Sequence, residues 1–290
     1  MQSNKLWNRR SMMKAVGVGV TASLASGRLV AKDQAEPHKP KGNIKQSVCQ
    51  WCYGSIPLEK LTTDAQKMGY QSIELLGPDD ILKVKKLGLT CAMVRCNSIA
   101  DGLNRKENHD RIEKELTTHI NFAADEGIPN VICMAGNRKG LADDEGLKVC
   151  AEGLKRVLGL AEKKKVTICM EGLNSKVDHK DYMYDKTIWG VELCKKLGSD
   201  RFKLLYDIYH MQIMEGDVIR TIRDYHQYIA HYHTGGNPGR NEIDDTQELN
   251  YPAIVKAILE TGYKGFLGQE FIPKRDPMKS LAQGFQICDV

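Results

Sequence analysis

Three acidic residues and one histidine stand at the ends of four short apolar runs in the second half of the chain. They are Glu171 after residues 166–170, Asp207 after 202–206, His233 at the end of 229–233, and Glu270 after 265–269. One acid in such a place is most often an ordinary polar residue, but four at equivalent places favour a shared site. Three carboxylates and an imidazole in one cavity would repel one another without a cation. This donor set, without thiolates, suits Mn²⁺, Mg²⁺ or Co²⁺ better than structural zinc.

Other polar residues follow the same runs and are candidates for holding a substrate. His210 lies three residues beyond Asp207, Arg240 lies seven beyond His233, and Asn174 lies three beyond Glu171. We expect His210 and Arg240 in loops, where functional side chains concentrate, with Arg240 able to grip a carboxylate in a two-pronged contact. The alternatives are a loop-capping histidine and a surface ion pair. Trp51 is a candidate for the pocket wall or for plain core.

The elements that must position these residues alternate between strands and helices. The apolar, β-branched runs that predict strands buried on both faces are 44–51, 72–76, 90–96, 130–135, 166–172, 202–208, 229–234 and 265–271. The helical patterns between them are 58–68, 78–87, 109–126, 143–164, 187–197, 216–225, 251–261 and 278–288, several followed by glycine. Eight βα units predict an α/β fold, a (β/α)8 TIM barrel, whose active site lies at the carboxyl ends of the strands. An open doubly wound sheet is less favoured, because no Gly-x-Gly-x-x-Gly follows the first strand.

Length and charge agree with one such domain. The chain has 290 residues, and a TIM barrel needs about 250. Its net charge is +5, but residues 1–31 hold five basic residues and no acid. Removing those five from the 42 basic residues leaves 37, equal to the 37 acidic residues, so the remainder is neutral. A nucleic-acid partner therefore loses support.

The first 31 residues predict export. Arg9 and Arg10 precede an apolar, small-residue run from Ala15 to Ala25, which is too short to span a membrane comfortably. The pattern resembles a bacterial twin-arginine signal and predicts a periplasmic protein without stable membrane insertion. A disordered basic start and an uncleaved anchor are the alternatives. We expect a signal at 1–31, a linker at 32–43 and the barrel at 44–290.

The nine cysteines are mainly expected in the core. Cys49 and Cys52 form one C-x-x-C pair, a weak metal or redox signal. Because both fall in a predicted strand, three residues apart, their side chains are expected on opposite faces as buried thiols.

Short segments in order along residues 44–275 resemble the xylose-isomerase-like sugar isomerase and epimerase family, and most of all the hydroxypyruvate isomerases. They are residues 132–136 (ICMAG), 170–174 (MEGLN), 207–212 (DIYHMQ), 237–240 (NPGR), 248–251 (ELNY) and 268–270 (GQE). The resemblance implies that Glu171 and Glu270 are the catalytic pair and bind the metal with Asp207 and His233. It implies that His210 and Arg240 hold substrate oxygens. Hydroxypyruvate isomerases tend to carry Gln where this chain has His233, whereas ketose 3-epimerases carry His, and the loop 175–186 does not match closely.

The expected reaction is proton transfer next to a carbonyl. The metal would act as a Lewis acid on a small sugar or hydroxy-keto acid and stabilise an enediolate, while one Glu removes a proton and the other returns one. Return to the neighbouring carbon is isomerisation, and return to the same carbon from the opposite face is epimerisation. A metallohydrolase of the endonuclease IV type would need more histidines, and a non-catalytic sugar-binding barrel would not need two glutamates. The oligomeric state is left open, a homo-oligomer included.

Overall fold

The computed structural model describes residues 39–96 and 98–290. The expected export signal lies outside the described residues, as does most of the expected linker. Lys41 N–H donates to Asp289 at 2.8 Å and the Asn43 amide donates to the carbonyl of Val290 at 2.7 Å, so the chain is attached to the barrel from Lys41 onward. No helix in the described part of the chain combines the length and apolarity that crossing a membrane requires.

Eight parallel strands form one sheet within the described residues. They are β1 (Lys45–Cys49), β2 (Ser72–Glu74), β3 (Met93–Val94), β4 (Asn130–Cys133), β5 (Thr167–Glu171), β6 (Phe202–Asp207), β7 (Ile229–Thr234) and β8 (Phe266–Gln269). Their order is β2-β1-β8-β7-β6-β5-β4-β3. Isolated parallel bridges Ser72–Thr90 and Leu76–Val94 join the two ends, so the sheet is nearly closed. The predicted TIM barrel is confirmed.

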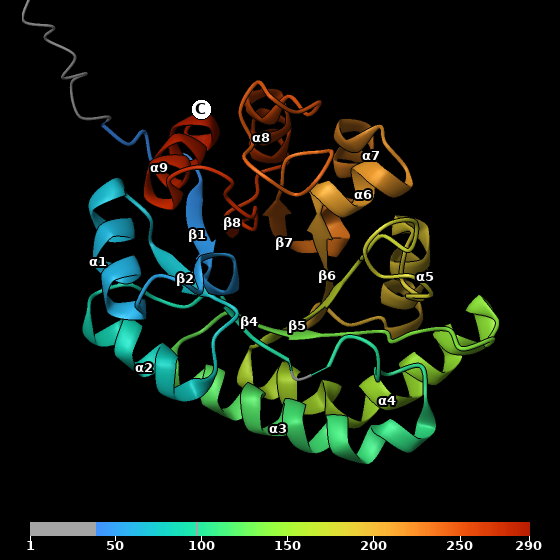
Figure 1. Ribbon diagram of the computed structural model, residues 1–290. Coiled ribbons are helices and arrows are strands. Elements are labelled where there is room, and N and C mark those ends of the chain that lie inside the picture. The colour runs from blue at the N-terminus through green and yellow to red at the C-terminus, as the bar shows by residue number, and fades with distance from the viewer. Residues whose placement is uncertain (1–38, 97) are drawn as a thin grey trace, which may run out of the picture. The chain divides into compact units, whose positions relative to one another are not determined.

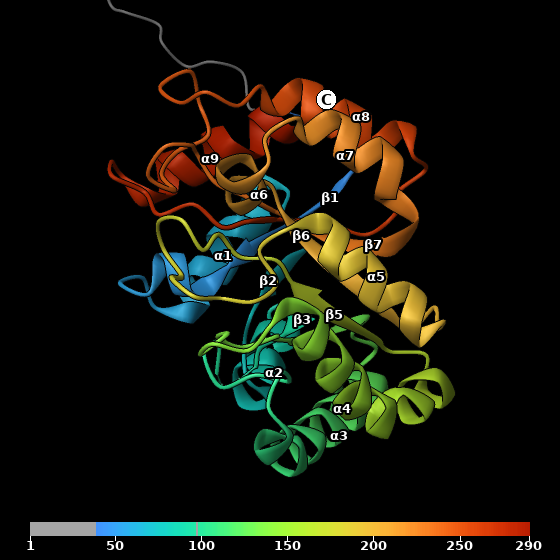
Figure 2. The same ribbon diagram turned by 90° about the vertical axis from the view of Figure 1, so that its right-hand side faces the viewer.

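Helices surround this barrel, as Figures 1 and 2 show. They are α1 (Leu58–Met68), α2 (Pro78–Lys86), α3 (His109–Glu126), α4 (Asp143–Lys164), α5 (Thr187–Leu197), α6 (Ile208–Met214), α7 (Val218–Tyr225), α8 (Tyr251–Glu260) and α9 (Pro277–Cys288). Helices α1, α3 and α5 end directly before Gly69, Gly127 and Gly198. Each of these glycines has a left-handed backbone conformation, as expected. The sequence did not predict α6, which starts directly after β6 with the Asp207 side chain accepting from the backbone N–H of His210.

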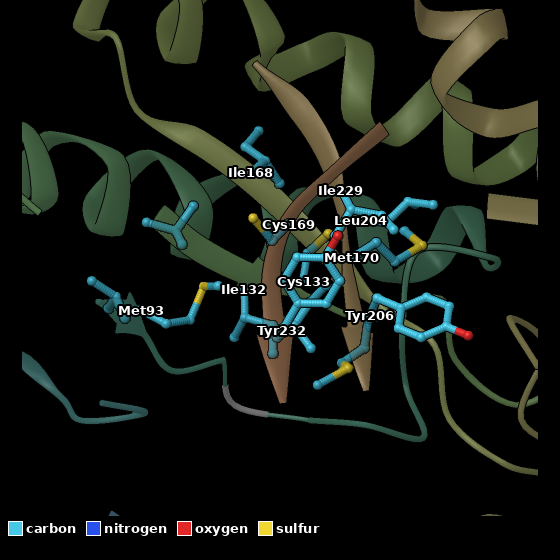
Figure 3. Packing of buried hydrophobic residues seen from close by; sticks show 14 of the residues in the cluster. Met93, Ile132, Cys133, Ile168, Cys169, Met170, Leu204, Tyr206, Ile229 and Tyr232 are labelled. Atoms are coloured by element: carbon cyan, nitrogen blue, oxygen red, sulfur yellow. The ribbon is translucent and has the colours of Figure 1, made fainter. Parts of the chain in front are cut away.

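The strands have almost no exposed residues, because helices cover them outside and their own side chains fill the inside. Figure 3 shows side chains of β4, β5, β6 and β7 packed together. The ring centroids of Tyr206 and Tyr232 lie 6.2 Å apart, edge to face. Leu204, Cys169 and Ile168 are completely buried among them. Such dense packing holds the strand ends, and the polar side chains on them, in fixed positions.

Candidate active site

The four expected metal ligands meet at one end of the barrel. Glu171 is the last residue of β5, Asp207 is the last of β6, His233 is the penultimate residue of β7, and Glu270 directly follows β8. One ligand atom of each lies within 4.8 Å of those of the others, and all four residues are buried. The strands are neighbours in the sheet, so the topology alone brings these ends together.

His233 is the centre of this group. Its Nδ1 lies 2.8 Å from Oε2 of Glu270 and 3.3 Å from Oε1 of Glu171. Its Nε2 lies 2.7 Å from Oε1 of Glu74. Because each ring nitrogen contacts a carboxylate, both carry a proton here; burial is outweighed by Cys49, Glu270 and Glu171, which raise the pKa of His233. A cation that replaced the proton on Nδ1 would meet a lone pair facing Glu171 and Glu270. Such a lone pair among acids is the environment that a divalent cation fits.

Arg240 partly neutralises the same acids. Its Nη2 lies 2.6 Å from Oε2 of Glu270 and 3.2 Å from Oδ2 of Asp207. The guanidinium is held between aromatic rings, 5.2 Å from the Trp51 centroid and 5.5 Å from that of Tyr209. Trp51 also donates from Nε1 to Oε1 of Glu270 at 2.8 Å. Arg240 is in a loop, as expected, and its ion pairs are with acids of the site and not with residues on the surface.

The expectation that His210 lies in a loop is wrong, because it lies in α6 and is fully buried. Its Nδ1 accepts from the backbone N–H of Asn174 at 3.2 Å and from the Asn174 amide at 2.6 Å. The ring proton therefore belongs on Nε2, which is buried, has no hydrogen-bond partner in the described residues, and lies 3.7 Å from Oδ2 of Asp207. His210, like Asn174, does not line the cavity at the site, so its contact with a substrate oxygen stays a prediction.

Asn174 contacts Nδ1 of His210. Its Nδ2 also donates to Asp178 at 2.7 Å, and its Oδ1 accepts from the backbone N–H groups of Val177 and Asp178. The residue is fully buried and does not line the cavity at the site. Direct contact of Asn174 with substrate stays a prediction, and the geometry favours an indirect role through His210.

Sequence reasoning missed Glu74, the last residue of β2. Its Oε1 lies 2.8 Å from Nε2 of His231 and 2.7 Å from Nε2 of His233, and it accepts from the Cys49 thiol at 3.5 Å. The available signal was an acid inside the apolar run 72–76, in a strand predicted to be buried on both faces.

Burial and charge move the carboxyl pKa values in opposite directions. Burial, followed by repulsion from Glu270, raises the pKa of Glu171. Burial also raises the pKa of Asp207 to about 8, although Arg240 opposes the shift. For Glu270 burial is outweighed by Arg240 and His233, which hold its pKa well below the usual range. Burial is likewise outweighed at Glu74, whose pKa is lowered by His231 and His233.

A cavity of about 430 Å³ opens over the acids. Glu171, Glu270 and Arg240 line one part of it, and Trp51 stands in its wall. Apolar side chains form much of the remaining wall, namely Leu75, Ile99, Ile132, Met134 and Leu173. An apolar cleft with a few converging polar groups is the usual form of a small-molecule site.

All nine cysteines are free thiols. Cys49 ends β1, but Cys52 lies in a short 3₁₀ helix (Gln50–Tyr53), so its placement in a strand was wrong. Burial raises the pKa of Cys96 to about 12, and likewise that of Cys91. These thiols act as core residues, as expected.

A parallel barrel with acids at the ends of its strands defines a TIM-barrel enzyme. The chain belongs to the xylose isomerase-like TIM barrel family, whose model matches residues 63–288. It is 26% identical over 237 residues to the human putative hydroxypyruvate isomerase, covering 80% of each chain. It is also 35% identical over 97 residues to a 2-oxo-tetronate isomerase of Cupriavidus necator, covering 33% of this chain and 37% of that one. These relatives identify the chain as an isomerase enzyme and confirm the resemblance found in the sequence.

Solved structures share the fold. An AP endonuclease, family 2, from Brucella melitensis has a TM-score of 0.73 at 20% identity, over 84% of this chain and 98% of that one. The 3-keto-D-glucoside 4-epimerase of E. coli has a TM-score of 0.71 at 16% identity, over 84% and 97% of the two chains. At such identities the likeness shows the fold alone.

Proposed function

We propose that the protein is a divalent-metal-dependent isomerase of small α-hydroxy carbonyl compounds, similar to hydroxypyruvate isomerase. One observation carries the proposal most: Nδ1 of His233 points between the carboxylates of Glu171 and Glu270, with Asp207 beside them. Four buried groups of this kind fit one cation and are costly to bury together without it. The names of the curated relatives support the reaction class.

Glu171, Asp207, His233 and Glu270 would hold the metal, with Mn²⁺ or Mg²⁺ favoured and Co²⁺ an alternative. Oxygen donors with one imidazole match these ions, and the four residues contribute no thiolate. When bound, such an ion supplies Lewis-acid polarisation of a carbonyl and its neighbouring hydroxyl.

Glu171 and Glu270 would move the proton. Both line the cavity, so a substrate carbon above them comes within reach of both carboxylates. One carboxylate takes the proton from the carbon that bears the hydroxyl, which leaves an enediolate. The other, as a carboxylic acid, gives a proton to the adjacent carbon, and the hydroxyl proton passes to the former carbonyl oxygen. The hydrogen bond from Trp51 fixes one oxygen of Glu270, which helps to orient the group.

His210 and Arg240 would bind the substrate oxygens. The Nε2–H of His210 is a buried donor without a partner among the described residues, and Arg240 brings positive charge to the oxygens of Asp207 and Glu270. Donors in place before the reaction stabilise charge that develops on an enediolate without reorganising. A small hydroxy-keto acid is the favoured substrate class, since the relatives include a 2-oxo-tetronate isomerase.

A ketose 3-epimerase or another sugar epimerase is the second candidate, favoured by one observation. The position that the resemblance assigns to Gln in hydroxypyruvate isomerases is His233 here. A metallohydrolase of the endonuclease IV type has less support, because the proposed ligand set has one histidine and the domain outside residues 1–31 is formally neutral.

The experiment that separates isomerase from epimerase is exchange in D₂O. The protein loaded with Mn²⁺ would be incubated separately with hydroxypyruvate, a 2-oxo-tetronate and small ketoses, and each product analysed by NMR. Deuterium on the original carbonyl carbon, with the carbonyl now on the neighbouring carbon, supports isomerisation. Inversion of configuration at the carbon that takes up deuterium supports epimerisation. Hydrolysis of abasic DNA would instead support a metallohydrolase of the endonuclease IV type.

We also propose export through a twin-arginine signal at residues 1–31. Support comes from the paired Arg9 and Arg10 before the apolar run. Fusion of these residues to a reporter that folds before transport should place it in the periplasm, and Arg9→Lys with Arg10→Lys should retain it in the cytoplasm. Equal transport of both fusions would contradict the proposal.

A further inference from the structure

Glu74 contacts His233, one of the four proposed metal ligands, and is not itself one of them. It ends β2, it is completely buried, and the register between β1 and β2 sets it opposite Cys49. Its Oε1 is the common contact of the Cys49 thiol, Nε2 of His231 and Nε2 of His233. A buried carboxylate with three partners on two other strands, β1 and β7, is a specific structural feature and not a chance polar residue.

The two ring nitrogens of His233 face different groups. Nε2 meets Glu74 at 2.7 Å, while Nδ1 faces Glu270 at 2.8 Å. An acceptor-only carboxylate requires a proton on the nitrogen that it contacts, so the ring carries a proton on each nitrogen here. A metal ion among Glu171, Asp207 and Glu270 would replace the proton on Nδ1 and leave the proton on Nε2 to Glu74. Resting on the proposed metal site, we propose that Glu74 is a positioning residue: it holds the proton of His233 on Nε2 and so keeps the Nδ1 lone pair turned toward the metal.

The backbone opposite His233 leaves space for this pair. His233 is paired in register with Gly268 of β8. A Cβ at Gly268 would lie 2.7 Å from Oε1 of Glu74 and 2.8 Å from Cδ2 of His233, both closer than real Cβ contacts. The glycine is therefore required by the carboxylate–imidazole contact itself, which is an observation independent of the hydrogen bond.

His231 shares the carboxylate of Glu74 with His233 but is not one of the four proposed metal ligands. It lies two residues before His233 on the same face of β7, and the two rings meet edge to face at 5.1 Å. Its Nε2 is 2.8 Å from the same Oε1 of Glu74. Two N–H donors on one oxygen keep the carboxylate ionised and fix its direction, which strengthens its hold on His233.

Cys49, Glu74 and His233 are also close enough to be read as a second metal group. That group offers one carboxylate and a thiol that donates to it, whereas the group at Nδ1 of His233 offers the three carboxylates of Glu171, Asp207 and Glu270. The positioning role therefore accounts for the contacts better, and it predicts one bound ion per chain and not two.

The test is the metal affinity of Glu74→Gln, measured by calorimetry with Mn²⁺ and no substrate. Glutamine keeps the shape and removes the charge, so affinity should fall by about 10–100-fold, the usual effect of losing the carboxylate behind a ligating histidine. Asp244→Asn is the matched control, since Asp244 is also a buried carboxylate that pairs with an arginine, Arg275, away from the four ligands. It should leave the affinity unchanged.

A second readout follows the proton itself. In ¹⁵N-labelled protein, the His233 Nε2–H should give a protected, strongly downfield NMR signal, with or without metal, and Glu74→Gln should move it upfield. Unchanged metal affinity and an unchanged signal would overturn the inference, as would two ions bound per wild-type chain. Wild-type protein that binds no ion but shows the Nε2–H signal would refute the metal dependence while leaving the contact with Glu74 intact.

Discussion

Oε1 of Glu74 lies 2.7 Å from Nε2 of His233, and Oε2 of Glu270 lies 2.8 Å from Nδ1 of the same ring. One imidazole thus connects Glu74 at the end of β2 with Glu171 at the end of β5 and Glu270 directly after β8. Because each nitrogen has a different carboxylate, the ring cannot turn over without losing both contacts. Its orientation is fixed before any ligand arrives, which is the preorganisation that a metal-assisted proton transfer needs.

Glu171→Gln should abolish turnover and leave the protein folded. Its pKa is raised by burial and by Glu270, so the ionised form is disfavoured without metal, and a neutral amide costs little stability. Loss of a general acid or base lowers kcat by about 10²–10⁴-fold. Steady-state rates and circular dichroism provide the measurement, and near-normal kcat would remove Glu171 from the proton-transfer pair.

Glu270→Gln should abolish turnover too, but with a different effect on stability. Glu270 pairs with Arg240 at 2.6 Å and with His233 at 2.8 Å, so its loss breaks both buried pairs and leaves Arg240 only the longer contact with Asp207 at 3.2 Å. Breaking a buried ion pair costs about 3–5 kcal/mol. Chemical denaturation of the metal-free proteins should therefore give a much lower free energy of unfolding for Glu270→Gln than for Glu171→Gln. Equal stability of the two variants would contradict this account of the site.

Removing the metal should abolish activity and lower the melting temperature. An ion that binds only the folded state stabilises it by about 2.7 kcal/mol at a concentration of 100 times Kd. Dialysis against a chelator, followed by addition of Mn²⁺, Mg²⁺ or Co²⁺, should restore both properties. Full activity after metal analysis shows less than one-tenth of an ion per chain would refute metal dependence.

The sequence predicted most of the barrel because its signals are local. Buried parallel strands are short apolar runs, and each helix from Leu58, His109, Asp143 and Thr187 was predicted with its observed bounds. The helix after Asp207 was missed because Ile208–Met214 lacks a polar face and follows a strand without a turn. The one indication of this helix was Asp207, a favourable N-cap residue that we interpreted as a metal ligand instead.

The site was predictable only where a polar residue ends an apolar run. Glu171, Asp207 and Glu270 have that pattern and the structure brings them together. Glu74 has it as well, but β2 reaches the other residues only because β1 pairs with β8 and closes the barrel. The role of Asn174 behind His210 depends on side-chain directions that residue spacing does not give.

Asn174→Ala should weaken substrate binding through His210. The change removes the 2.6 Å amide contact to Nδ1 and leaves only the backbone N–H at 3.2 Å, so the orientation and tautomer of the ring are held less firmly. A buried hydrogen bond is worth about 1 kcal/mol or slightly more, so KM should rise by about tenfold. In a His210→Ala background the same change should add almost nothing, since coupled residues are not additive. Additive effects on KM would instead support direct contact of Asn174 with substrate.

Gly268→Ala should destabilise the barrel where Glu74 contacts His233. The new methyl would lie 2.7 Å from Oε1 of Glu74, and neither partner can move freely because both are completely buried. Overpacking of this kind costs about 1–3 kcal/mol, and metal affinity should fall with it. Gly159→Ala is the matched control, since its Cβ in α4 meets nothing within 4 Å and a helix favours alanine by about 1 kcal/mol. Denaturation and Mn²⁺ calorimetry on both variants measure the two effects, and a Gly268→Ala protein as stable and as tightly metal-binding as Gly159→Ala would show that the contact is not closely fitted.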